Sequence, residues 1–497
     1  MKSFLKDTAK HTFVYGIGSI LQSAIGFFLL PLYLHYLTPS DYGILALLSV
    51  LSMLFGSLIL QGIPTALFRS FSYDYLDKPD QQKEAVGSAY LYLLIFPFVL
   101  YGTLWLLAPQ ISNITFKGSG PVFLVRLIFL TGFFGASSNV LFVVLRARLK
   151  SKTTVFISIL RGIINISFNI YFVVVLNLKV AGIVWGNLIT EALMFLVTPI
   201  LLRKDLVWKI SYHKLKEMLL FGWPLMPGAI AMWILASADR YFLEHFSTTA
   251  ELGLYSLGFR IATVITIILL DPFRLAWPAV FYPEAKKEGA TLAFSRFSTY
   301  FLLISGGVGL MLILGAEPLI KLMGPSEYWS AHRVVPIIIF SVIIGNEGLQ
   351  SIIGIGWFIK KKTHFAPIVV GVGAVANIVL NWLFVPAYGM MGAAIATLLS
   401  SVIMLFTSQK IVSYFYPIKF ELRRVSMLAT IAILITILNY LPNIEPFLLN
   451  ISYKLLLFLL YPILLYITGF FTEEEKSIIK NVREGGLKSL ITVMKST

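Results

Sequence analysis

A segment near the start of this sequence recurs 210 residues later, as His245 follows His35. Residues 35–47 read HYLTPSDYGILAL and residues 245–257 read HFSTTAELGLYSL, so His, Thr, Gly and Leu recur in register. Further matches are Gly182 and Gly392, Leu188 and Leu398, Thr190 and Ser400, and the pair Asn165 and Asn169, which recurs as Asn377 and Asn381. Such duplication predicts two equivalent halves, and membrane transporters commonly enclose their site between halves of this kind.

Hydrophobic residues make up 58% of the 497-residue chain and charged residues only 13%, which indicates a membrane protein. Fourteen apolar stretches reach the roughly 20 residues that a helix needs to cross a bilayer. They lie near 11–37, 42–66, 86–110, 122–146, 154–177, 180–202, 217–243, 251–274, 291–316, 334–357, 364–385, 388–409, 424–441 and 451–471. We therefore expect an all-α integral membrane protein with about 14 transmembrane helices, arranged as two pseudo-symmetric six-helix bundles plus a C-terminal helix pair.

The repeat also sets the expected domain boundaries. We expect an N-terminal six-helix lobe at 1–205, a C-terminal six-helix lobe at 206–412, transmembrane helices 13 and 14 at 413–471, and a cytoplasmic amphipathic tail at 472–497. The loops between these stretches are too short to fold as a soluble catalytic domain. We therefore expect a protein that is not an enzyme and has no catalytic residues.

Basic residues are distributed unequally between alternate loops, although the net charge of +16 would suggest nucleic acid in a soluble protein. Of the 40 Lys and Arg residues, 31 lie on the side that includes the N-terminus, five lie on the other side and four lie within the stretches. Cytoplasmic loops carry such an excess, so we expect the cytoplasmic membrane, with both termini in the cytoplasm. Attraction to anionic lipid explains the net charge, and we expect no nucleic-acid partner.

Metal and cofactor chemistry have little support in the sequence. The chain has no cysteine, its six histidines are scattered without metal-ligand spacing, and no phosphate-binding P-loop is present. We therefore expect no metal and no cofactor. Transport would then depend on a gradient or on substrate supply.

Ionisable residues inside apolar stretches are costly and usually face a protein interior or a wet cavity. In the first half these include Arg161 and Glu191, at depths that allow them to meet. A structural salt bridge is one interpretation, and a role in substrate binding or proton coupling is the other.

The second half carries Asp239, Arg240, Arg260, Asp271 and Glu347 in its apolar stretches. Neighbouring residues point about 100° apart on a helix, so Asp239 and Arg240 are expected to have different partners. Arg260 is the best single candidate to bind a substrate anion, because a guanidinium grips phosphate or carboxylate in a bidentate way. The alternative is that Asp239 neutralises Arg260. Asp271 and Glu347 are possible coupling or structural charges.

Three further features can be interpreted structurally or functionally. Arg69 ends the second stretch, where it either snorkels to the interface or meets an incoming lipid phosphate. The two asparagine pairs are explained by hydrogen bonds between helices within each half. Pro224 and Pro227 are expected to bend the seventh span, as a static kink or as a hinge.

Three segments carry a resemblance to a known family: LPLYLHYLTPSDYGILALLSV at 30–50, SADRYFLEHFSTTAELGLYSLGFRIA at 237–262, and Gly62 to Arg69. With the fourteen stretches and the repeat, the chain resembles the polysaccharide-transporter branch of the multidrug/oligosaccharidyl-lipid/polysaccharide exporter superfamily, which is MATE-like. Within that branch, the chain resembles the O-antigen flippase (Wzx) type. The resemblance covers essentially the whole chain.

This resemblance implies a flippase that moves an undecaprenyl-diphosphate-linked oligosaccharide repeat unit from the inner to the outer leaflet of the cytoplasmic membrane. The glycan would be O-antigen, capsule or another exported polysaccharide. Its partners would be the lipid-linked oligosaccharide, membrane lipids, and a polysaccharide polymerase and chain-length regulator. The family cavity implies substrate-binding roles for Arg69, Asp239, Arg240 and Arg260. Charges within the stretches are balanced here, so a strongly cationic cavity is not expected.

Two alternatives within the superfamily stay open. A cation-coupled multidrug exporter would use a membrane acid, for which Glu191 and Glu347 are candidates. A lipid II flippase would bind a related lipid-linked substrate. A membrane glycosyltransferase or polymerase is less consistent with the sequence, because the outer loops are short and poor in acids.

Overall fold

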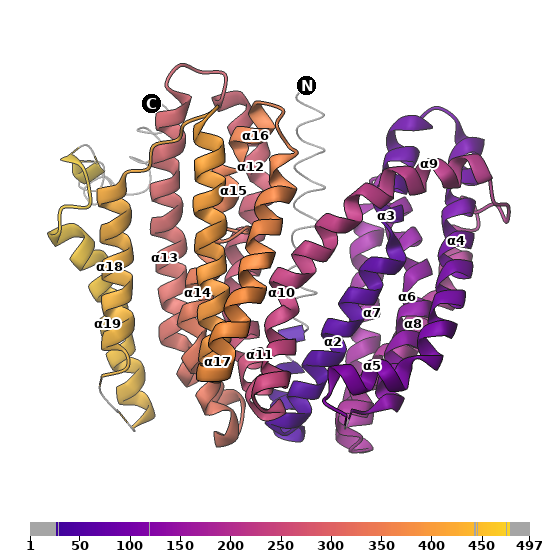
Figure 1. Ribbon diagram of the computed structural model, residues 1–497, viewed down its shortest axis with the longest axis horizontal. Coiled ribbons are helices and arrows are strands. Elements are labelled where there is room, and N and C mark those ends of the chain that lie inside the picture. The colour runs from indigo at the N-terminus through magenta and orange to yellow at the C-terminus, as the bar shows by residue number, and fades with distance from the viewer. Residues whose placement is uncertain are drawn as a thin grey trace.

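Two groups of helices converge at one end of the molecule and diverge toward the other (Figure 1). The structure is a computed structural model that describes residues 26–477, apart from 28, 119, 442, 443, 445 and 474, and without the side chains of 275, 276 and 279. All regular elements in this part of the chain are helical. We call the converging end, at the bottom of Figure 1, the Pro39 end, because helix α2 begins there at Pro39. The opposite end is the Arg69 end, because helix α3 ends there at Arg69.

The first group runs from the start of the described chain to Leu202. Residues 29–36 are helical and continue into α2 through the N-cap Thr38. The elements that follow are α2 (Pro39–Leu60), α3 (Ile63–Arg69), a π-helix (Ser70–Asp74), α4 (Pro79–Leu106), α5 (Ala108–Thr115), α6 (Val122–Ala147), α7 (Ser151–Ile170), a second π-helix (Tyr171–Val175) and α8 (Lys179–Leu202).

The seventh span crosses from one group to the other (Figure 1). It consists of α9 (Tyr212–Gly222), a 3-10 turn (Trp223–Leu225) and α10 (Met226–Phe246). Near the Arg69 end, Gly222 of α9 packs directly against Gly62, where an added Cβ on Gly62 would lie 2.6 Å from the Gly222 Cα. The 3-10 turn contains Pro224, so the bend that the prolines predict occurs at this point.

The second group contains a broken span and a merged pair of spans. Its elements are α11 (Thr249–Ala262), a π-helix (Thr266–Leu270), α12 (Asp271–Glu284), α13 (Ala290–Met323), a 3-10 helix (Ser326–Val334), α14 (Val335–Ile344), α15 (Leu349–Ile353), α16 (Ile355–Ile359) and α17 (Phe365–Ser413). The 49-residue α17 turns at Gly389, whose φ of 52° suits glycine, and thus joins the predicted eleventh and twelfth spans. The pair α18 (Leu422–Leu438) and α19 (Phe447–Ile467) lies outside this group, in yellow in Figure 1.

Eleven helices of the described chain are long and apolar enough to cross a membrane. The sequence predicts fourteen spans, and three local features account for the difference between fourteen and eleven. Much of the first predicted span lies outside the described residues, α17 contains two predicted spans, and α18 has only 17 residues. The chain is a multi-pass membrane protein, and the count of fourteen stays a prediction.

Repeated residues occupy equivalent positions in the two groups. Asn165 Nδ2 donates to Thr190 Oγ1 at 3.4 Å, and Asn377 Nδ2 donates to Ser400 Oγ at 3.4 Å. An added Cβ on Gly182 would lie 3.0 Å from the Phe172 carbonyl oxygen. One on Gly392 would lie 2.2 Å from that of Phe384. The interhelical hydrogen bonds expected from the asparagine pairs are therefore present in both groups. The domain boundaries stay predictions.

The two copies of the repeated segment meet at the Pro39 end. Thr38 caps α2 in a capping box with Asp41, and Thr248 caps α11 by accepting from the Glu251 N–H. Both caps start helices that pack against each other, and the matched glycines Gly43 and Gly253 are buried at the crossing. The first α2 turns therefore contact the first α11 turns, backbone against backbone.

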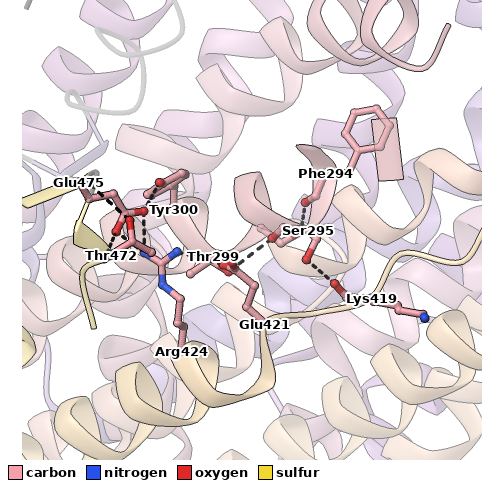
Figure 2. A network of polar contacts seen from close by, with 10 residues as sticks. Phe294, Ser295, Thr299, Tyr300, Lys419, Glu421, Arg424, Thr472 and Glu475 are labelled. Atoms are coloured by element: carbon pink, nitrogen blue, oxygen red, sulfur yellow. Dashed lines mark hydrogen bonds and ion pairs between the residues drawn. The ribbon is translucent and has the colours of Figure 1, made fainter. Parts of the chain in front are cut away.

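A polar network ties the last described residues to α13 and α18 (Figure 2). Glu475 accepts hydrogen bonds from Arg424 at 2.9 Å, from the backbone N–H of Thr472 at 2.8 Å, and from the Tyr300 hydroxyl. Burial acts to raise the pKa of Glu475, but these hydrogen bonds and the Arg424 charge outweigh it and lower the pKa. The ionised carboxylate thus fixes the start of the predicted tail. The tail beyond residue 477 lies outside the described residues.

Candidate functional site

A cavity of about 540 Å³ lies between the two groups of helices. Segments from the N-terminal part of the chain, α2, α7 and α8 form one wall, and α10 and α11 form the other. The lining residues are Gly26, Leu29, Tyr33, Tyr42, Leu45, Ala46, Ser49, Val50, Met53, Asn165, Ile183, Asn187, Ala236, Ser237, Arg240, Ser256, Phe259, Arg260 and Thr263. Both halves of the repeat therefore contribute to one chamber.

Arg260 lines this cavity from α11. Its Nη2 atom donates to the Gly26 carbonyl oxygen at 2.6 Å, across the gap between the two groups. Within the described chain its side chain has no ion-pair partner, and the hydrogen bond to Gly26 leaves most of its five N–H donors available. Arg260 is thus a half-buried cation within a membrane span. A backbone carbonyl orients it, and no acid of the described chain neutralises it.

Arg240 also lines the cavity, but its environment differs from the predicted one. Its Nη1 atom contacts Asp239 Oδ1 at 3.3 Å and donates to the Ala236 carbonyl at 2.7 Å. The expectation that Asp239 and Arg240 have different partners is wrong, because the long arginine side chain curls back along its own helix. The guanidinium also lies 4.7 Å from the ring centroid of Phe259.

Asp239 is 1% exposed and lies behind the cavity wall. It accepts hydrogen bonds from the Tyr255 hydroxyl and the Arg240 backbone N–H, and does not bind Arg260. The alternative in which Asp239 neutralises Arg260 is therefore wrong. Asp239 instead positions Arg240, so of these two predicted substrate residues only Arg240 faces the chamber.

The charged residues among those that line the cavity are Arg240 and Arg260, and no carboxylate joins them. Balanced charges along the spans therefore do not give a balanced lining. The acids of the apolar stretches lie elsewhere: Asp239 behind the wall, Glu191 on Arg161, and Asp271 and Glu347 on other partners. A chamber of this charge favours an anionic ligand.

Arg69 does not join the two cavity arginines. It lies at the Arg69 end, where Asp74 is 3.5 Å away and the Phe221 ring centroid 5.0 Å away, and its side chain is 50% exposed. Asp271 contacts Arg274 at 3.6 Å, and both side chains are largely exposed. Neither residue lines the chamber.

Glu347 lies in a break of the tenth span that the sequence did not reveal. The helix stops at Ile344 and resumes at Leu349, and Gly348 approaches the Ile343 carbonyl so closely that a Cβ would lie 1.8 Å from it. Thr266 Oγ1 donates to Glu347 Oε2 at 2.9 Å, which ties the break to the π-helix after α11. Glu347 is absent from the cavity lining.

Arg161 and Glu191 are in direct contact, as their predicted depths allow. Arg161 on α7 forms an ion pair with Glu191 on α8, and the Glu191 side chain is 12% exposed. The Arg161 guanidinium also lies 5.9 Å from the Phe142 ring centroid on α6. The pair therefore joins three helices of one group, away from the chamber.

Neutralising either member of this pair is expected to lower the amount of folded protein. Arg161→Gln or Glu191→Gln leaves one charge in a low-dielectric environment, which typically costs about 3–5 kcal/mol. Size-exclusion chromatography of a fluorescent fusion measures the folded fraction, and the swap of Arg161→Glu with Glu191→Arg should restore part of it. Normal accumulation of the single variants, together with lost transport, would instead assign the pair a role in transport.

Several residues that line the cavity were not predicted from the sequence. Asn187 accepts from Asn165 Nδ2 at 2.8 Å, and both face the chamber. Asn187 is a polar residue inside an apolar stretch, so the rule that located the charges would also have found it. Tyr33 and Ser256 carry no such signal, since hydroxyl residues are common in spans. Metal-holding groups of three or more His, Cys, Asp or Glu are not found among the described residues.

Comparisons with solved structures identify the architecture. The lipid II flippase MurJ in an inward closed conformation aligns with a TM-score of 0.69 at 14% identity, covering 94% of this chain and 99% of that one. A multidrug resistance MATE family transporter of the MOP superfamily, in an inward-facing conformation, aligns with a TM-score of 0.62 at 16% identity, covering 80% and 95%. An uncharacterised membrane protein of Methanocaldococcus jannaschii is 21% identical over 444 residues, covering 81% of this chain and 83% of that protein.

The helical architecture, with a chamber between its halves, is the fold of the flippase and multidrug-transporter structures with which it aligns. The family model for polysaccharide biosynthesis protein matches residues 35–333, more than half of the chain. The chain belongs to this polysaccharide biosynthesis family.

Proposed function

We propose that this protein moves an undecaprenyl-diphosphate-linked oligosaccharide repeat unit from the inner to the outer leaflet of the cytoplasmic membrane. The exported glycan is O-antigen, capsule or another surface polysaccharide. The observation that carries this proposal is the chamber whose charged lining residues, Arg240 and Arg260, are both cations. A diphosphate is the anionic part of such a substrate, and arginine binds its oxygens with planar, charge-assisted hydrogen bonds.

The two arginines have complementary roles in this proposal. Arg260 keeps most of its donors free and binds the diphosphate, while Arg240 is held by Asp239 and adds charge from the neighbouring helix α10 on the same wall. On the opposite wall, Asn165 and Asn187 supply amide groups that can hydrogen-bond to sugar hydroxyls. Arg69, exposed at the Arg69 end, is the first cation that an incoming headgroup meets. This arrangement supports substrate-binding roles for Arg69, Arg240 and Arg260, with Asp239 as a positioning residue.

A reconstituted system tests the proposal directly. The purified chain in proteoliposomes should move a fluorescent undecaprenyl-diphosphate oligosaccharide between leaflets, as measured by its protection from a membrane-impermeant reductant. Lipid II in parallel vesicles tests the alternative that this chain moves peptidoglycan precursor. Preferential transport of lipid II, or no transport of either lipid, would contradict the proposal.

The multidrug-exporter alternative has less support from the cavity. A site for cationic drugs favours a carboxylate, whereas Glu191 is paired with Arg161 and Glu347 accepts from Thr266 outside the lining. Accumulation of a cationic dye in cells that lack the protein, with normal surface glycan, would favour that alternative.

Both termini are proposed to lie in the cytoplasm, so the Arg69 end faces the cytoplasm and the Pro39 end faces outward. The distribution of Lys and Arg supports this orientation. Because the chain has no cysteine, single-cysteine variants test it cleanly. Lys117→Cys should react with an impermeant maleimide in intact cells, and Lys361→Cys only after permeabilisation. Both side chains are exposed. The reverse pattern would invert the topology.

A further inference from the structure

A second pocket, of about 350 Å³, lies between the two groups at the Pro39 end. Thr115 and Lys117 line it from the end of α5 and the loop that follows. The facing wall consists of α10, which contributes Glu244 and His245, and α17, which contributes Trp382. This pocket is separate from the central chamber and shares no lining residue with it.

Glu244 lines this pocket with one carboxyl oxygen unsatisfied. The residue is 6% exposed, and its Oε1 atom accepts from the Thr249 hydroxyl at 3.1 Å. Its Oε2 atom is buried and has no hydrogen-bond partner in the structure. A buried carboxylate oxygen without a donor is costly, so a ligand that brings an N–H or O–H group would be stabilised here.

Lys117 supplies the opposite charge from the other group of helices. Its Nζ atom donates to the Ser247 carbonyl at 3.4 Å, and among the described residues it forms no ion pair. Two of the three ammonium donors are therefore available to a ligand. Lys117 and Glu244 line the same pocket without contacting each other, which leaves an opening with one positive and one negative side.

Aromatic residues complete the walls of the pocket. Tyr241 and Trp382 line it, and Trp382 is 61% exposed. Aromatic faces attract ammonium groups, and Trp and Tyr favour the level of lipid headgroups. A ligand that matches all three features carries a primary ammonium, a phosphate and an adjoining apolar chain.

We propose that this pocket binds the phosphoethanolamine headgroup of a membrane phospholipid. The ammonium donates to Glu244 and lies against the aromatic walls, while Lys117 binds the phosphate. Because Lys117 belongs to one group of helices and Glu244 to the other, the bound lipid links them at the Pro39 end. It therefore stabilises the arrangement in which this end is closed.

Native mass spectrometry of the full-length protein in detergent tests the proposal. The chain is titrated with phosphatidylethanolamine, with phosphatidylcholine, whose methylated ammonium has no N–H donor, and with phosphatidylglycerol, which has no ammonium. Phosphatidylethanolamine should bind about tenfold more tightly than either, the size of one charge-assisted hydrogen bond. Equal affinity for the three lipids overturns the proposal.

Variants assign the recognition to the pocket. Glu244→Gln keeps the side-chain size and should abolish the preference for phosphatidylethanolamine, whereas Lys117→Gln should weaken all three lipids. Glu327→Gln removes an exposed carboxylate outside this pocket and serves as the matched control with unchanged binding. An unchanged preference in Glu244→Gln overturns the proposal. If that variant does not fold, Lys117→Gln and Trp382→Ala, both at exposed positions, still test the proposal. Lipid binding equal to that of the parent chain in both variants overturns the proposed site. Binding is measured without transport, so this result is independent of the substrate that the chamber carries.

Discussion

Replacing Arg260 by alanine is expected to abolish export of the glycan while leaving the amount of folded protein near that of the parent chain. Arg260 makes one hydrogen bond, to the Gly26 carbonyl, and no ion pair within the described chain, so its loss strands no buried partner charge. It does remove the cation with the most free donors in the chamber. Charge-assisted hydrogen bonds of about 1.5–3 kcal/mol correspond to a roughly 10- to 150-fold weaker hold on the diphosphate. Surface glycan and lipid-linked repeat units on the inner leaflet measure the effect.

Two further variants separate charge from geometry. Arg260→Lys keeps the charge but loses the planar fork, so it should retain partial export if attraction dominates and little if bidentate binding does. Arg333→Ala, at an exposed arginine outside the chamber, is the matched control and should export normally. Normal surface glycan in a stably expressed Arg260→Ala strain would remove Arg260 from the mechanism.

The sequence predicted contacts best where one physical rule acts alone. Hydropathy placed most spans, and the repeat placed Asn165 and Asn377 in equivalent hydrogen bonds with Thr190 and Ser400. The Arg161 and Glu191 contact followed from depth, since two opposite charges in hydrocarbon on neighbouring helices are strongly attracted.

The charge of the chamber could not be predicted from a balance of residues. Net charge along a span does not say which face of the helix carries each group, and Arg240 turned back onto Asp239 through side-chain flexibility that spacing does not encode. The break at 345–348 was hidden for a different reason. Its glycines interrupt a long apolar run, and hydropathy does not register whether a glycine continues a helix or ends it.

Adding a methyl group to either glycine of the matched pair is expected to open the Pro39 end. A Cβ on Gly43 would lie 2.1 Å from the Thr249 carbonyl oxygen, and one on Gly253 would lie 1.9 Å from that of Pro39. Both neighbours are backbone atoms of the facing helix, so neither can turn aside. Overpacking of this kind costs about 1–3 kcal/mol, and here the cost falls only on the arrangement in which α2 and α11 touch. Gly43→Ala and Gly253→Ala should therefore shift the population toward the state that is open at this end, by roughly 5- to 150-fold.

Spin labels measure this shift without competing native thiols, since the chain has no cysteine. Tyr36 and Phe246 are exposed and lie next to the two repeated segments, so labels at these positions report the separation of the two groups by pulsed electron resonance. Gly56→Ala is the matched control on the same helix, because nothing lies within 4 Å of its added Cβ. The control should keep the parental distance distribution, whereas Gly43→Ala and Gly253→Ala should each add a longer component. Parental distributions in both variants would show that the backbone contact does not hold this end closed. If transport requires alternate closure of the two ends, the same variants should also slow it, because the state that Gly43 and Gly253 stabilise would be visited less often.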